Sequence, residues 1–238
     1  MKYIKILKIA ERMRMLHKSV LATDKFRAFV WCFLAYSCLS WLAFYFSQHL
    51  IHISMIWNLF LAFLPLVFAY LLSRKVKKIT KISLIALWLL FIPNAFYVLT
   101  DFIHISDLSY FVGGYYDFKN VDYVKDAVVY LELINIAVGY LLALMMGLSS
   151  FATVQQLFVK KRQAFVVIPV VFLLIGYAIY IGRFMRLNSW DVLLSPAKLL
   201  ERVTASFNWF GLVMTVLFAG YAAAVYFGFR YLVKSKSR

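Results

Sequence analysis

The sequence predicts an all-α protein that crosses a membrane six times, and three observations lead to this prediction. Of the 238 residues, 64% are hydrophobic and only 15% are charged, whereas a soluble domain is about half apolar and about a quarter charged. Several apolar runs reach the ~20 residues that a helix needs to cross the hydrocarbon core. These runs are continuous rather than alternating, which favours helices over the strands of a membrane barrel.

The apolar runs, taken in order, define the elements. The predicted spans cover residues 26–47, 54–72, 82–100, 127–149, 164–184 and 207–229. Together they form a transmembrane domain, residues 26–229, between a basic amphipathic segment at 1–25 and a basic tail at 230–238. About 25 residues precede the first run and no cleavage pattern is evident, so we expect the first helix to be retained. The leading segment is interpreted as a helix in the inner interface, or alternatively as a solvated basic leader.

The connections that bound the first three spans alternate in charge. The segment up to Arg27 holds eight Lys or Arg, and QHLIHI after the first span holds none. SRKVKKITK after the second span holds five, and the loop after Thr100, which follows the third span, holds two.

The last three spans continue this alternation. VKKRQ after the fourth span holds three Lys or Arg, the loop 183–206 holds four, and the tail from Arg230 holds four. One side therefore carries twenty basic residues and the other six, which is a strong positive-inside signal. We expect both termini to be cytoplasmic. Because the net charge of +16 is concentrated at the ends of spans, it does not indicate nucleic-acid binding.

Acidic residues show the opposite distribution. Glu11 and Asp24 belong to the predicted inner side, and the other eight lie in outer loops or at outer helix ends. Acidic residues have little effect on topology, so membrane insertion does not explain this bias. It indicates that the outer face has a function of its own.

The stretch FIPNAFYVLTDFIH, residues 91–104, places polar residues inside an apolar run. Pro93 lies near the middle of the bilayer and frees a backbone carbonyl, and the neighbouring Asn94 is available to an adjacent helix. At about 100° per residue, four polar residues fall within about 80° of one another: Asn94, Tyr97, Asp101 and His104. Such a stripe faces another helix or a cavity, because facing lipid costs several kcal/mol.

Other outer helix ends supply partners for this stripe. Glu132, with Asn135, lies near the outer end of the fourth span, and GRFMRLNSWD follows the fifth. The candidate ligand-binding residues are Asn94, Tyr97, Asp101, His104, Glu132, Arg183, Arg186, Asn188 and Asp191. The alternative is that these charges only lock helices together.

Four further features of the sequence can be interpreted. His49 and His52, with His104 and the outer carboxylates, have the chemistry of a zinc site, but no metal motif is present and we predict no metal. The aromatic loop 100–126, with its turn at Gly113–Gly114, is typical of an interfacial belt or of a lid. Cys32 and Cys38 are interpreted as small core residues. A stripe of small and polar residues in the sixth span predicts close helix packing: Asn208, Gly211, Thr215 and Ala219.

PNAFYVLTDFIH and YIGRFMRLNSWD resemble segments of a bacterial family of polytopic membrane proteins, domain of unknown function thirteen-sixty-one. That family pairs a PNAPY-like segment and a TD-x-x-H element with a later GR-x-x-R-x-NSWD element. The matching residues are Pro93, Asn94, Tyr97, Thr100, Asp101, His104, Gly182, Arg183, Arg186, Asn188, Ser189, Trp190 and Asp191. The resemblance covers about residues 82–229. It implies a bacterial plasma membrane and no assigned activity.

The leading functional hypothesis is an outward-facing polar site that binds or moves a small anionic or lipid-like ligand, since the arginine fork matches phosphate and carboxylate. An alternative is an enzyme acting on an outer-leaflet lipid-linked substrate, with Asp101 and His104 as acid and base. A third is a non-catalytic scaffold. No cofactor is predicted, the expected partner is the lipid bilayer, and the sequence makes no prediction of oligomeric state.

Overall fold

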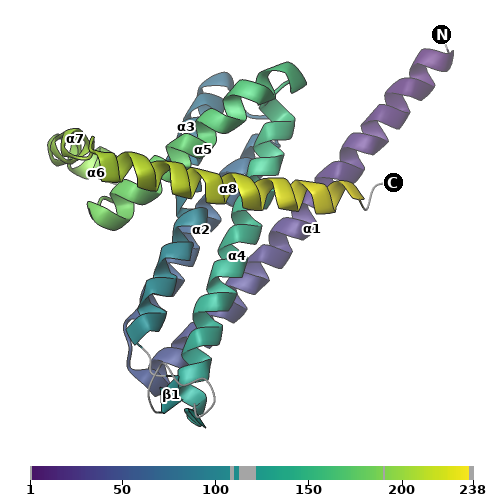
Figure 1. Cartoon of the computed structure of the whole chain (residues 1–238). Coiled ribbons are helices and arrows are strands. Elements are labelled where there is room, and N and C mark those ends of the chain that lie inside the picture. Colours follow the sequence, from purple (N-terminus) through teal and green to yellow (C-terminus); the bar gives the residue numbers. More distant parts are fainter. Residues whose placement is uncertain (1, 108–109, 113–121, 190, 236–238) are drawn as a thin grey trace.

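Long helices dominate the computed structural model, which describes residues 2–107, 110–112, 122–189 and 191–235 (Figure 1). The elements are α1 (Lys2–Ser47), α2 (Ile51–Leu72), α3 (Lys78–Tyr97), the 3₁₀ helix η1 (Val98–Asp107), β1 (Phe111–Val112), β2 (Asp122–Tyr123), α4 (Ala127–Phe158), α5 (Lys161–Phe184), α6 (Asp191–Leu194), α7 (Pro196–Ala205) and α8 (Trp209–Ser235). The two short strands pair antiparallel, with Phe111 opposite Tyr123.

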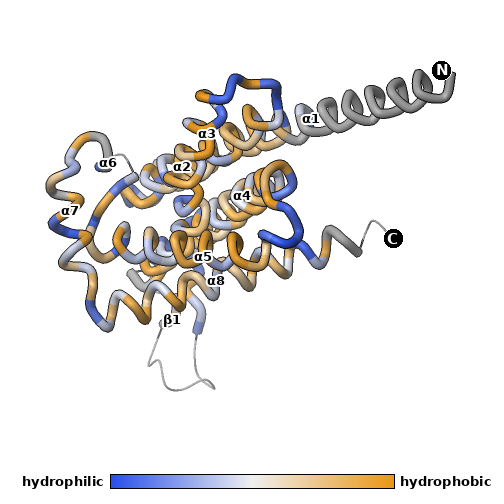
Figure 2. The backbone as a smooth tube through the Cα atoms, turned by 90° about the horizontal axis from the view of Figure 1, so that it is seen from above, coloured by the Kyte–Doolittle hydropathy of each residue, from blue (hydrophilic) through white to orange (hydrophobic). Residues whose placement is uncertain are grey.

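Within the described ranges, six helices are long and apolar enough to cross a membrane. These segments are Phe26–Ser47, Ile51–Leu72, Lys78–Ile105, Ala127–Phe158, Lys161–Phe184 and Trp209–Leu232. The predicted fold class, an all-α protein with six spans, is therefore confirmed, and the protein is a multi-pass membrane protein. Figure 2 shows that hydrophilic residues gather in the turns between α2 and α3 and between α4 and α5, whereas the helices are mostly apolar.

The helices form two groups that meet at α3. In the first group α2 contacts α1, α3 and α4, and in the second α5 packs extensively on α8. Contacts of α3 with both α4 and α5 join the groups. The start of α1 and the end of α8 lie towards the same side of the molecule, away from α6, α7 and the β1–β2 hairpin, and α8 runs at a steep angle to α4 (Figure 1).

A buried hydrogen-bond chain ties three helices of the first group together. Trp88 Nε1, on α3, donates to Ser150 Oγ, on α4, at 2.6 Å. That hydroxyl donates in turn to the carbonyl of Pro65, on α2, at 2.8 Å. In a lipid environment each polar group needs such a partner, so these bonds set how the three helices face one another.

Small residues allow the closest helix contacts. A Cβ added at Gly147 would lie 2.5 Å from Ala95 Cβ, where α4 meets α3. A Cβ at Gly176 on α5 would meet the carbonyl oxygen of Thr215 and lie 2.7 Å from the backbone nitrogen of Ala219, both on α8. The small and polar stripe of the sixth span therefore packs closely against α5, as predicted.

The third span changes helix type at its outer end. α3 continues past Pro93 to Tyr97, and η1 follows directly. Thr100 Oγ1 donates to the carbonyl of Tyr97 at 2.8 Å, which satisfies one of the groups released there. A 3₁₀ helix turns by about 120° per residue, so the assumption of ~100° per residue up to His104 was wrong after Tyr97.

Of three other expectations, one is contradicted by the structure and two are not tested by it. Cys32 and Cys38 are exposed on α1, so their interpretation as core residues was wrong. The leading segment continues the first span without a break as part of α1, and its place in the interface stays a prediction. Much of the aromatic loop lies outside the described residues, including the turn at Gly113–Gly114.

Candidate functional site

Asp101 is the buried acidic group at the centre of the candidate site. It lies in η1 and is only 2% exposed. Its Oδ2 accepts a hydrogen bond from Asn58 Nδ2, on α2, at 2.7 Å. Its Oδ1 lies 3.7 Å from Nη1 of Arg183, at the end of α5. The two signature segments, separated by most of α4 and α5 in sequence, therefore meet at this carboxylate.

The pair between Asp101 and Arg183 is electrostatic rather than hydrogen-bonded. A separation of 3.7 Å exceeds the 2.7–3.2 Å of an N–H···O hydrogen bond. Among the residues that the structure describes, the Arg183 side chain donates no hydrogen bond, and it is 19% exposed. Its charge is thus compensated, while its donor fork remains available to another oxygen.

A cavity of about 160 Å³ is lined by Asn58, the hydrogen-bond donor to Asp101, and by Gly182, which precedes Arg183, whereas the two charged side chains are not part of its lining. Side chains of α2, α3, α5, α7 and the turn after α5 line it, including Asn58, Asn94 and Asn188. Asn94 Nδ2 donates to Ser189 Oγ at 3.1 Å, and Ser189 Oγ donates to the carbonyl of Leu90 at 3.2 Å. The polar residue beside Pro93 therefore holds the turn after α5 against α3 and forms part of the cavity wall.

The turn after α5 presents its residues by reversing the chain. Arg186 has a φ of 54°, a left-handed conformation that costs a non-glycine residue free energy. The side chain of Arg186 is exposed, whereas that of the next residue, Leu187, is buried. The backbone N–H of Asn188 donates to Asp191 Oδ2 at 2.7 Å, so Asp191 closes the turn locally. Arg202, on α7, donates to the carbonyl of Met185 and fastens this helix over the turn.

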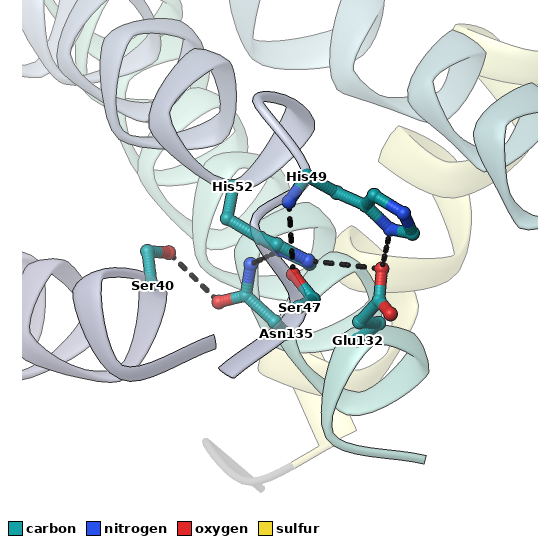
Figure 3. A network of polar contacts seen from close by, with 6 residues as sticks. All are labelled: Ser40, Ser47, His49, His52, Glu132 and Asn135. Atoms are coloured by element: carbon teal, nitrogen blue, oxygen red, sulfur yellow. Dashed lines mark hydrogen bonds and ion pairs between the residues drawn. The ribbon is translucent and has the colours of Figure 1, made fainter. Parts of the chain in front are cut away.

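A second buried cluster surrounds Glu132 (Figure 3). Its Oε2 lies 2.7 Å from His49 Nδ1 and 3.2 Å from His52 Nε2. His49, in the turn between α1 and α2, has a side chain that is 56% exposed, whereas His52 is fully buried in α2. One carboxylate oxygen on α4 thus joins a surface imidazole to a buried one.

Neighbouring bonds determine the hydrogen position on His52. Ser40 Oγ donates to Asn135 Oδ1 at 2.7 Å, which orients the Asn135 amide so that its nitrogen faces His52 Nδ1 at 2.8 Å. An amide nitrogen only donates, so Nδ1 accepts and Nε2 carries the hydrogen towards Glu132. Helices α1, α2 and α4 are therefore linked by one continuous polar chain.

Tyr110 adds a tyrosine hydroxyl near this second cluster. Burial raises the pKa of Tyr110, and the negative charge of Glu132 and the neighbouring Tyr130 raise it further. Its hydroxyl is buried and has no hydrogen-bond partner among the residues that the structure describes. The phenol therefore ionises less readily than that of an exposed tyrosine.

The structure divides the predicted site residues between the two clusters. Asn94, Tyr97 and Asn188 line the cavity, and Asp101 and Arg183 form the adjacent pair. Glu132 instead contacts His49 and His52, and its part in a shared ligand site stays a prediction. His104 follows Asp101 in η1, and Trp190 lies outside the described residues. In the described ranges, no group of three or more His, Cys, Asp or Glu is arranged to hold a metal ion.

Sequence reasoning missed two residues, one beside Asp101 and one in the cluster around Glu132. Asn58 hydrogen-bonds Asp101, and it stands as a lone amide in the apolar second span, a signal that was available. Ser40, which orients Asn135, carries no comparable signal because serine is common in spans.

Comparisons with known proteins support the resemblance noted from the two motifs. No curated protein and no solved structure matches the chain. One family model matches residues 57–225, a region that includes both motifs and the cavity residues. Its description is "Protein of unknown function (DUF1361)". Because this match covers most of the chain, the protein belongs to that family.

Proposed function

We propose that this protein binds or moves a small anionic or lipid-like ligand through the site at Asp101 and Arg183. The proposed location is a bacterial plasma membrane, as the family resemblance implies, with both termini in the cytoplasm. In this orientation the cavity opens on the outer side, where eight of the ten acidic residues also lie.

The main support for the proposal is that Arg183 is paired with a charge but makes no hydrogen bond to it. Arg183 is held 3.7 Å from a buried carboxylate without a hydrogen bond. It does not line the cavity itself, but it directly follows Gly182, which does. A guanidinium group has five N–H donors in a planar fork that matches phosphate and carboxylate oxygens. Asp101 anchors the charge of Arg183, and the ligand supplies the acceptors that Asp101 does not.

The size and lining of the cavity favour a small ligand. Its volume of about 160 Å³ lies below the ~300 Å³ at which pockets for drug-sized ligands begin. Asn58, Asn94 and Ser189 place amide and hydroxyl groups around it. The exposed Arg186 directly precedes Leu187, which lines the cavity. These groups fit an inorganic anion, a short carboxylate or the phosphate of a headgroup.

The test is a thermal-shift titration of the detergent-purified protein with inorganic phosphate, glycerol phosphate and acetate. At least one anion is expected to raise the unfolding temperature in a saturable manner. Arg183→Lys keeps the positive charge opposite Asp101 but removes the fork, so it is expected to weaken anion protection at least ~10-fold without unfolding the protein. Arg74→Lys, at an exposed arginine on the opposite side, is the matched control and is expected to bind as the parent does.

Two results would overturn the proposal. One is the absence of protection by all three anions. The other is equal protection of the parent protein and Arg183→Lys, because the guanidinium fork would then make no contact with the ligand.

A further inference from the structure

A groove of about 330 Å³ lies between α3, α4 and α5, on the side of the basic turns. Its deeper walls are apolar and include Trp88, Phe151, Ile168 and Val171. The indole nitrogen of Trp88 is already satisfied by Ser150, so the floor offers no polar group to a ligand. The deep part of this groove therefore suits a hydrocarbon chain.

The groove changes from polar to apolar along its length. On α3, Lys81, Ile85 and Trp88 stand at i, i+4 and i+7 and share one face. On α5, Gln163 and Val171 mark the two ends of the lining, about 12 Å apart at ~1.5 Å per residue. The polar residues of both helices come first, next to the basic turns.

Two cations are positioned at the polar end by contacts with groove residues. Lys81 Nζ lies 4.5 Å from the ring centroid of Phe158. Arg230, on α8, donates through Nη1 to Gln155 Oε1, which lines the groove. The backbone N–H of Lys160 donates to Gln163 Oε1 at 3.3 Å, which sets a third basic residue beside the same end.

We propose that this groove binds an anionic phospholipid of the leaflet next to the basic turns. Its acyl chain lies on Trp88 and Val171, and its phosphate lies between Lys81 and Arg230. A hydrophobic slot that ends in fixed cations matches the chemistry of such a lipid, and anionic lipids are concentrated in the cytoplasmic leaflet.

The charges at the groove also argue against a second copy of the chain as the occupant. A two-fold interface centred here would place Lys81, Lys160 and Arg230 of one copy near the same cations of the other. This site is separate from the cavity at Arg183, and the proposal does not depend on the function proposed for that cavity.

Native mass spectrometry of the detergent-purified protein tests this proposal, with phosphatidylglycerol and phosphatidylcholine of identical acyl chains as probes. Phosphatidylglycerol is expected to bind at least ~5-fold more tightly than phosphatidylcholine. Lys81→Gln is expected to lower the affinity for phosphatidylglycerol about fivefold, because one lysine near an anionic headgroup contributes about 1 kcal/mol. Lys75→Gln, an equal change of charge at an exposed residue of the preceding turn, is expected to change the affinity less than about twofold.

A groove-filling variant tests the position of the acyl chain. Val167 lines the groove and is 39% exposed, so Val167→Trp has room to fold while it occupies the slot. It is expected to abolish tight retention of phosphatidylglycerol, whereas Val166→Trp, at a neighbouring residue that is 63% exposed and does not line the groove, is expected to leave this retention unchanged. Equal retention of the two lipids, equal effects of Lys81→Gln and Lys75→Gln, or retention by Val167→Trp would each overturn the proposal.

Discussion

The pair of Asp101 and Arg183 makes the sharpest prediction about this protein. At 3.7 Å and an effective dielectric constant of ~20, the attraction between the two charges is roughly 4.5 kcal/mol. Arg183→Met removes the arginine charge from the buried carboxylate and leaves the hydrogen bond from Asn58, so we expect a loss of about 3–5 kcal/mol in the free energy of unfolding. Asp101→Asn leaves a guanidinium that is partly in contact with solvent, and we expect a loss of about 1–3 kcal/mol.

A double-mutant cycle measures the coupling between these two residues. The double variant, Asp101→Asn with Arg183→Met, carries no charge at either position of the pair and is expected to be more stable than Arg183→Met alone by at least ~1 kcal/mol. The free energies are measured by reversible unfolding in mixed micelles with increasing SDS. Additivity of the two single effects within ~0.5 kcal/mol would show that the residues do not interact, and would refute the reasoning. A charge swap is not expected to restore stability, because the Asn58 amide is oriented to donate to position 101.

Three further predictions use the same unfolding measurement. Gly176→Ala is expected to destabilise the protein by about 1–3 kcal/mol because the new methyl group meets the α8 backbone. Gly220→Ala, where a Cβ meets nothing within 4 Å, is expected to be neutral or to stabilise by up to ~1 kcal/mol; equal effects at both positions would contradict the close α5–α8 contact. Trp88→Phe loses the buried hydrogen bond between α3 and α4 and is expected to cost about 1–3 kcal/mol, so an unchanged stability would show that this bond is not made. Glu132→Gln is expected to cost about 1–3 kcal/mol because two imidazoles lose a charged acceptor, while His49→Gln, at an exposed side chain, is expected to cost less than ~1 kcal/mol, and the reverse order would contradict the assigned burial.

The membrane architecture could be predicted from the sequence because it depends on local properties. Apolar runs of sufficient length form spans whatever their neighbours, so all six were found. The end of α3 could not be predicted in this way. The change to a 3₁₀ helix at Val98 depends on how η1 packs against α2 and α4, and nothing in the apolar pattern of the run indicates it.

The candidate site shows the same division between local and non-local information. Topology places the outer helix ends together, so an approach of Asp101 to Arg183 could be expected from the sequence. Topology does not specify which way each helix is rotated. Glu132 therefore lies towards α1 and α2, with His49 and His52, although its position along α4 was estimated correctly.

The cost of the buried charges argues for a ligand site over a scaffold. A buried ion pair is weak evidence of stability, because desolvation offsets much of its attraction. This protein also has other means of joining its helices: Gly147 packs against Ala95, and Gly176 packs against the backbone of α8. Those contacts involve no charge and suit helix association in lipid. A scaffold assembled in this way has no need for the Asp101 carboxylate, which is held in the interior at 2% exposure. It also has no need for an arginine opposite this carboxylate whose N–H groups do not hydrogen-bond to Asp101. In the proposed anion site both groups have a role, because the carboxylate orients the arginine and the donors that the carboxylate does not use are available to the ligand.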